Sequence, residues 1–171
     1  QNFKGAPVIR TVGSNAEIYI KDVEFSNNAN EKRDGGVIED AYSQHDTKIE
    51  LSNAVFQNNK ANRGGVVRAA SSAITVKGCT FTNNSANDEG GAFYLDGGAD
   101  VRGAVLTIES GKFYQNTAVN RGGAISGTQD ISVTVKGGTF EKNRAGRGGA
   151  IYLNSDKYDD VTTFLIVSGG E

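Results

Sequence analysis

The sequence predicts an all-β protein, a parallel β-helix (a solenoid) of about six coils with three short strands in each coil. Three observations lead to this fold class: a repeat of 25 to 32 residues, an alternating apolar pair in each repeat, and a glycine pair in each repeat. Self-similarity at such a period is the signature of repeat architectures. No stretch shows apolar residues at helical spacing over three turns.

Two tetrapeptides recur five times each. The first, F-x-x-N, begins at Phe25, Phe56, Phe81, Phe113 and Phe140 and ends at Asn28, Asn59, Asn84, Asn116 and Asn143. The second, G-G followed by Ala or Val, begins at Gly35, Gly64, Gly90, Gly122 and Gly148. Because these residues return at the same place in every repeat, we expect them to be structural and not catalytic.

Each repeat contains three predicted strands in a fixed order. The first carries two apolar residues around one polar residue, starting seven residues before the phenylalanine; the pairs are Ile18 and Ile20, Ile49 and Leu51, Ile74 and Val76, Leu106 and Ile108, and Val133 and Val135. Apolar residues at period two predict a half-buried strand. A second strand carries the phenylalanine, and a third follows the glycine pair and is led by Ile38, Val67, Phe93, Ile125 or Ile151.

Equivalent residues of successive coils should form columns, because coils stack at the ordinary inter-strand spacing of about 4.8 Å. We expect a phenylalanine column inside the solenoid and an aliphatic column two strands away from it. The asparagines should form a third column at the bend after the phenylalanine, where each amide can bond to the coils above and below. The glycine pair suits a tight turn that needs positive φ and no side chain.

The whole chain, residues 1–171, is interpreted as a single β-helix domain. Leu165 and Val167 repeat the apolar pair of a sixth coil, whose phenylalanine position would fall one residue beyond Glu171. Neither end shows a polar cap of the kind that protects exposed β-helix edges. The chain is therefore expected to be a segment of a longer solenoid, which we prefer, or its open ends pair with other copies.

Composition restricts the partners. The chain has 18 Lys and Arg against 20 Asp and Glu, a net charge of −2, whereas nucleic-acid binding needs a basic stripe. No apolar run approaches the roughly 20 residues that span a bilayer, so we expect no membrane insertion of this segment. Cys79 is the single cysteine, which excludes an intrachain disulfide. No cofactor is expected.

The paired tetrapeptides resemble the polymorphic outer-membrane protein repeats of chlamydiae. Residues 81–84 with 90–93, and 140–143 with 148–151, match the F-x-x-N and G-G-A-[ILV] pattern of that family best. The resemblance implies a right-handed, single-stranded parallel β-helix displayed outside the cell, of the kind used as an adhesin stalk or passenger domain. It implies an extracellular or cell-surface location.

The preferred functional interpretation is a non-catalytic structural rod that presents loops 39–48, 96–105 and 154–163 to a protein or glycan partner. One alternative is a subunit of a head-to-tail filament, in which the last coil of one copy pairs with the first coil of the next. A second alternative is a carbohydrate-active enzyme, which needs carboxylates that converge in one groove.

Single residues that could carry chemistry have simpler structural interpretations. Cys79 lies where the other repeats have small residues, so we expect an interior filler and not a reactive thiol. His45 lies in a polar connection without a second His or Cys to complete a metal site, so we expect a solvated side chain.

Acidic and basic clusters also have simpler structural interpretations. Calcium could be held by oxygen-rich loops with Asp96 and Asp100, or with Asp156, Asp159 and Asp160, but solubilising loops are preferred. A short threonine column, Thr75, Thr107 and Thr134, is expected to be ordinary exposed strand surface and not an ice-binding array. A basic edge near the glycine pairs comprises Lys32, Arg33, Arg63, Arg121 and Arg147. This edge could meet an acidic glycan or a neighbouring copy, but protection against lateral strand pairing is preferred.

Overall fold

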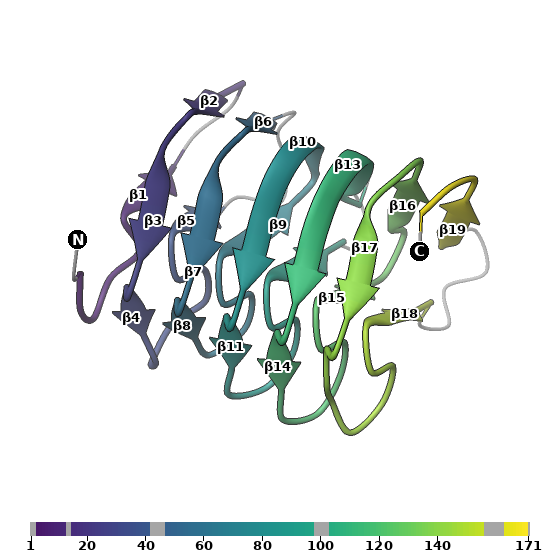
Figure 1. Cartoon of the computed structure of the whole chain (residues 1–171). Coiled ribbons are helices and arrows are strands. Elements are labelled where there is room, and N and C mark those ends of the chain that lie inside the picture. The colour runs from purple at the N-terminus through teal and green to yellow at the C-terminus, as the bar shows by residue number, and fades with distance from the viewer. Residues whose placement is uncertain (1–2, 13–14, 42–46, 98–102, 156–162, 171) are drawn as a thin grey trace.

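The computed structural model describes residues 3–12, 15–41, 47–97, 103–155 and 163–170 (Figure 1). These residues form strands and bends without a helix, and every strand pairing among them is parallel. The strands belong to three sheets that form the walls of a solenoid. The predicted fold class, a parallel β-helix with three short strands in each coil, is confirmed.

The first sheet holds the apolar pairs and the phenylalanines. Its strands are β2 (Glu17–Lys21), β3 (Glu24–Ser26), β6 (Thr47–Ser52), β7 (Val55–Gln57), β10 (Ser72–Thr82), β13 (Val105–Tyr114), β16 (Ser132–Val135), β17 (Thr139–Glu141) and β19 (Phe164–Val167). In β10 and β13 the two predicted strands run together as one. The bend between them is a register shift at 76–79 of β10, so pairing continues through it where a break was expected.

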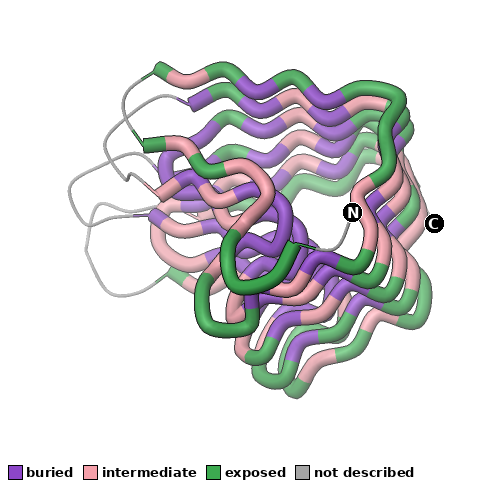
Figure 2. The backbone as a smooth tube through the Cα atoms, turned by 90° about the vertical axis from the view of Figure 1, so that its left-hand side faces the viewer, coloured by how far each residue is buried: buried purple, intermediate pink, exposed green. Residues whose placement is uncertain are grey.

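The second and third sheets complete each coil. The second sheet is short and comprises β4 (Ala29–Asn30), β8 (Lys60–Ala61), β11 (Ser85–Ala86) and β14 (Thr117–Ala118). The third sheet follows the glycine pairs and comprises β1 (Ile9–Thr11), β5 (Ile38–Asp40), β9 (Val67–Ala70), β12 (Phe93–Asp96), β15 (Ile125–Thr128) and β18 (Ile151–Asn154). Figure 2, which looks along the stack, shows that the successive coils superpose.

The core is a stack of aromatic rings inside the solenoid. The five phenylalanine rings of the F-x-x-N motifs lie one above the other, with centroid distances of 5.6, 5.0, 4.8 and 4.5 Å from Phe25 to Phe140 and neighbouring planes within 9° of parallel. Phe93 of the third sheet meets the stack edge-on at Phe81. Aliphatic residues of the first and third sheets fill the remaining interior.

An asparagine ladder runs beside the aromatic stack. The Asn84 Oδ1 atom accepts hydrogen bonds from both the backbone N–H and the Nδ2 of Asn59, each at 3.0 Å. The Asn84 Nδ2 in turn donates to the Phe56 carbonyl and to Asn116 Oδ1 in the neighbouring coils. The same pattern links Asn28 to Asn59. In Asn59, Asn84 and Asn116 the side-chain amide therefore joins the coils on both sides of it.

Two bends in each coil require a backbone conformation with positive φ. The residue before each ladder asparagine has positive φ, for example Asn83 at 53°, and asparagine adopts this conformation more readily than most residues. At the glycine pair, Gly90 has a φ of +67°. A Cβ on the second glycine, Gly91, would lie 2.1 Å from the carbonyl oxygen of Gly123 in the next coil. The motif therefore keeps two backbones close together.

Candidate functional site

The three loops expected to contact a partner leave the solenoid at one corner. They begin after β5, β12 and β18 of the third sheet and end before β6, β13 and β19 of the first sheet. Residues 42–46, 98–102 and 156–162 of these loops lie outside the described part of the chain. Two other coils turn this corner with the single residue Ser71 and with residues 129–131, and β1 is joined to β2 by residues 12–16. From β5 onward, long and short connections therefore alternate along the stack.

Polar contacts hold this corner together. Asp40, which is fully buried at the end of β5, accepts hydrogen bonds from the hydroxyls of Thr11 and Ser72. The Arg68 guanidinium donates to the backbone carbonyl of Asp40 and forms an ion pair with Asp96, at 3.2 Å between Nη2 and Oδ2. The strand ends from which two of the long loops depart are thus fixed to the coil between them.

A column of charged residues lies at the bend just before the glycine pairs. Its members alternate in charge over four coils and then break the alternation; they are Asp34, Arg63, Glu89, Arg121 and Arg147. Backbone hydrogen bonds from the following glycines connect the neighbours in the column. The expected basic edge is therefore a ladder of mixed charge, because acids of two coils pair with arginines of the next.

The first ion pair of this ladder is bidentate. The Arg63 guanidinium contacts both carboxylate oxygens of Asp34, at 2.6 Å for the shortest pair of atoms. The same guanidinium lies 4.4 Å from the centroid of the Tyr94 ring and donates to its hydroxyl. Burial is the largest single effect and lowers the Arg63 pKa. The hydrogen bonds with Asp34, together with the electrostatic attraction of Tyr94, Asp34 and Asp96, outweigh it and raise the pKa, so Arg63 stays charged.

The same arrangement returns two coils later. Arg121 Nη1 lies 3.1 Å from Glu89 Oε1, and the guanidinium carbon lies 5.2 Å from the Tyr152 ring centroid. The other oxygen of Glu89 accepts a hydrogen bond from Ser126. In both cases an acid, an arginine and a tyrosine come from three successive coils, which gives this face a period of two coils.

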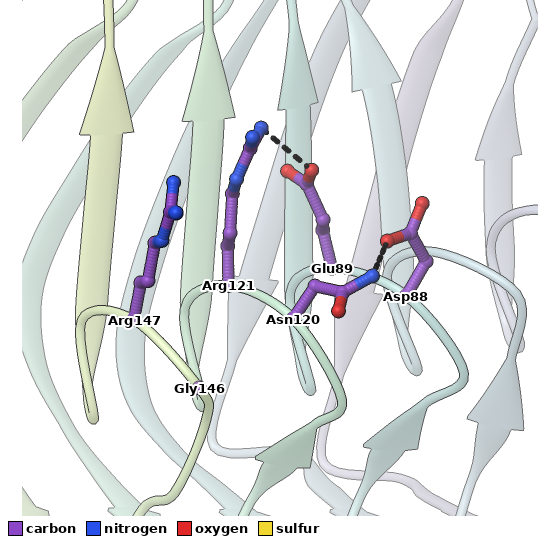
Figure 3. A pocket seen from close by; sticks show the side chains of 6 residues that line it. All are labelled: Asp88, Glu89, Asn120, Arg121, Gly146 and Arg147. Atoms are coloured by element: carbon purple, nitrogen blue, oxygen red, sulfur yellow. Dashed lines mark hydrogen bonds and ion pairs between the residues drawn. The ribbon is translucent and has the colours of Figure 1, made fainter.

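A polar groove follows the ladder at its later coils (Figure 3). It has a volume of about 380 Å³ and is lined by Asp88, Glu89, Asn120, Arg121, Gly146 and Arg147. Figure 3 shows the Arg121 and Arg147 side chains extended side by side, with Arg121 reaching Glu89. Asn120 donates to Asp88 at 2.7 Å. Within the described chain, no acidic side chain pairs with Arg147.

Several other candidate site residues from the sequence have structural roles. Cys79 is 1% exposed, and burial raises the pKa of its thiol. Thr75, Thr107 and Thr134 are cross-strand neighbours on the outer face of the first sheet. Asp96 pairs with Arg68, and no three His, Cys, Asp or Glu side chains among the described residues gather as a metal site would require. The remaining candidates lie outside the described residues: His45, Asp100, Asp156, Asp159 and Asp160.

Sequence reasoning missed the acidic half of the ladder. Asp34 and Glu89 directly precede their glycine pairs, as Arg63 and Arg121 do, so aligning the residue before each glycine pair would have shown the alternation. Tyr94 and Tyr152 carry a comparable signal, since each is the second residue of a third-sheet strand. The groove itself depends on how neighbouring coils pack, which no single repeat specifies.

Comparison with known proteins identifies the repeat. The profile of the Chlamydia polymorphic membrane protein repeat matches residues 78–99 and 137–154. A relative named probable outer membrane protein pmp21, from Chlamydia pneumoniae, is 27% identical over 170 residues, which cover 90% of this chain. No solved structure matches the chain significantly. The resemblance to polymorphic membrane protein repeats is thereby confirmed.

The matched region makes up 10% of the Chlamydia pneumoniae protein, so this chain spans about a tenth of that relative's length. In the part of the chain that the structure describes, no helix has the length and hydropathy needed to cross a membrane.

Proposed function

We propose that this chain is a non-catalytic structural rod at a cell surface, which presents the loops 39–48, 96–105 and 154–163 to a protein or glycan partner. The single observation that carries the proposal is the common origin of the three loops at one corner of the solenoid. Binding residues are often carried on loops that a rigid scaffold positions. Loops on alternate coils are about two inter-strand spacings apart, roughly 10 Å, so one partner can contact all three.

The stiffness required of a rod has a physical basis in the coil contacts. Each coil is joined to the next by backbone ladders in three sheets, by ring stacking and by the asparagine ladder. Polar contacts at Asp40 and Arg68 fix the strands from which the loops depart. The loops can therefore vary in sequence without disturbing the frame that holds them.

A surface location is supported by the relative's name. That protein is described as an outer membrane protein, and the family profile is that of a membrane-protein repeat. In the ladder of charged residues that precede the glycine pairs (the pre-glycine ladder), Asp34 forms an ion pair with Arg63, and Glu89 forms one with Arg121. This arrangement supports a scaffold more directly than an acid–base pair that flanks a scissile bond.

Adhesion of coated beads to cultured epithelial cells tests the proposal. Residues 42–46, 98–102 and 156–162 are replaced by Gly/Ser segments of equal length, singly and together. We expect adhesion to fall with each replacement and to disappear with all three, while the thermal unfolding midpoint stays within about 4 °C, because loop changes leave the coil contacts intact.

The matched control changes three residues on the outer face of the first sheet, Glu50→Gln, Thr75→Ser and Thr107→Ser, and should adhere like the parent. Release of reducing sugar from acidic and neutral polysaccharides is measured in parallel, and none is expected. Undiminished adhesion after triple loop replacement, or catalytic release of sugar, contradicts the proposal.

A further inference from the structure

We infer that the groove between Arg121 and Arg147 is a binding site for a sugar carboxylate, such as a uronic acid residue of a glycan. The inference concerns a different surface from the loop corner and does not require the scaffold role proposed above. It rests on a break in the charge ladder, on the shape of the groove, and on the chemical character of its lining.

The break in the ladder leaves two like charges next to each other. Coils with a long loop carry an acid before the glycine pair, Asp34 and Glu89, and coils with a short connection carry an arginine. The fifth coil has a long loop, yet it carries Arg147 at this position. Arg121 and Arg147 are paired across adjacent coils, so their backbones are about one inter-strand spacing apart. Like charges directly opposite each other are unfavourable, and an anion between them removes the repulsion.

The groove is open at this coil because a side chain is absent. Two positions before the glycine pair, the second to fourth coils carry Asn62, Asp88 and Asn120, and the fifth carries Gly146. Asn62 and Asn120 each donate to an acid of the preceding coil. Gly146, the residue before Arg147, lines the groove without such a side chain. Compared with the preceding coils, the fifth coil thus lacks a carboxylate at position 147 and any side chain at position 146.

The lining favours a sugar carboxylate over a polyanion. Two arginines supply planar donor sets suited to a carboxylate. Asp88 and Glu89 balance their charge, so the groove as a whole has no net charge with which to attract a densely charged chain. The Asp88 carboxylate is accessible from the groove, with one oxygen bonded to Asn120, and can accept hydrogen bonds from ring hydroxyls. A volume of about 380 Å³ is within the range of small-molecule sites.

Titration of the isotopically labelled protein with sodium D-glucuronate, followed by amide NMR shifts, tests the inference. Saturable shifts are expected at the amides of Asn120, Arg121, Gly146 and Arg147. The methyl ester of glucuronate keeps the hydroxyls and removes the charge, and it should bind at least about tenfold more weakly, because a charge-assisted hydrogen bond is lost. Sodium acetate keeps the charge without the ring and should also bind at least about tenfold more weakly.

Two variants separate the site from general charge effects. Arg147→Gln should weaken glucuronate binding about tenfold or more. Arg144→Gln removes the same charge from an exposed residue of the same coil that does not line the groove, and it should bind like the parent. Arg147→Glu restores the alternation and should abolish binding while raising the thermal midpoint.

Each contrary result overturns the inference in a defined way. Absence of saturable shifts at the groove, equal binding of the methyl ester, or unchanged binding by Arg147→Gln excludes a carboxylate site here. Acetate binding as tight as glucuronate binding excludes the sugar specificity. The two proposals fail separately: undiminished adhesion after triple loop replacement contradicts the scaffold role, and absence of glucuronate binding contradicts the groove site.

Discussion

At the bend after each phenylalanine, a side-chain amide takes over hydrogen bonds that the backbone cannot make to the next coil. Asn84 is fully buried and connects Asn59, Phe56 and Asn116, which belong to the coils on either side. An aspartate or leucine of similar size could not supply both donors and an acceptor. The recurrence of asparagine at this position therefore follows from hydrogen bonding and not from volume.

Replacement of Asn84 by alanine should lower the free energy of unfolding by about 2–4 kcal/mol, since several buried donors and acceptors lose their partner at once. Urea unfolding at pH 7 measures the effect. Asn143→Ala is the matched control: Asn143 is half-buried, and in the described chain it is joined to Asn116 and Phe113 on one side only, so the loss should be smaller. Equal losses for the two variants would argue against a ladder that bridges coils.

Cys79 gives a prediction for pH dependence. Burial raises the pKa of its thiol above the ordinary value of 9.0, so the thiol of the unfolded chain ionises first as the pH rises. The contribution to stability is complete below pH 9 and is lost as the pH rises toward the folded-state pKa. Urea unfolding between pH 8 and pH 10 should therefore show a steeper fall in stability for the parent than for Cys79→Ala. Identical slopes would mean that the thiol is not buried.

At the scale of elements, the sequence predicted the three strands of each coil because their patterns are local. Alternation around Ile74 and Val76, and the glycine pair at Gly90, mark strand and turn without reference to other coils. The fusion of two strands in β10 could not be predicted in this way, because pairing through the bulge depends on register with β13. The ion pairs of the pre-glycine ladder likewise join residues about 30 positions apart.

The second glycine of the pair sets how closely two coils approach. Alanine at Gly91 would place its Cβ 2.1 Å from the backbone oxygen of Gly123, whereas at Gly149 the nearest atom is 3.6 Å away. Gly91→Ala should therefore destabilise the protein strongly, by about 3 kcal/mol or more, as overpacking against rigid backbone does. Gly149→Ala should leave stability within about 1 kcal/mol of the parent. Thermal unfolding of both variants decides between this account and simple loss of turn flexibility, which predicts similar effects.

At the scale of the whole molecule, two periods are superimposed. The core repeats in every coil, as the phenylalanine and asparagine columns show, and this period was visible in the sequence. The outer surface repeats every second coil, through long loops and through the Asp34–Arg63 and Glu89–Arg121 pairs. The second period escaped prediction because it lies in the residue before each glycine pair and in the connection lengths, outside the recurring motifs that were aligned.

The central claim is that equivalent residues lie one coil apart along a straight stack, whatever their separation in the sequence. Tyr19, Thr134 and Ile166 belong to one cross-strand column, in which Thr134 lies four coils from Tyr19 and Ile166 lies five coils from it. Spin labels on cysteines at 19 and 134, and at 19 and 166, in a Cys79→Ala background, report this directly by pulsed dipolar spectroscopy. With about 4.8 Å per coil, the backbone separations should be about 19 Å and about 24 Å. Distances that do not grow by one coil spacing between the two pairs would contradict the stacked solenoid.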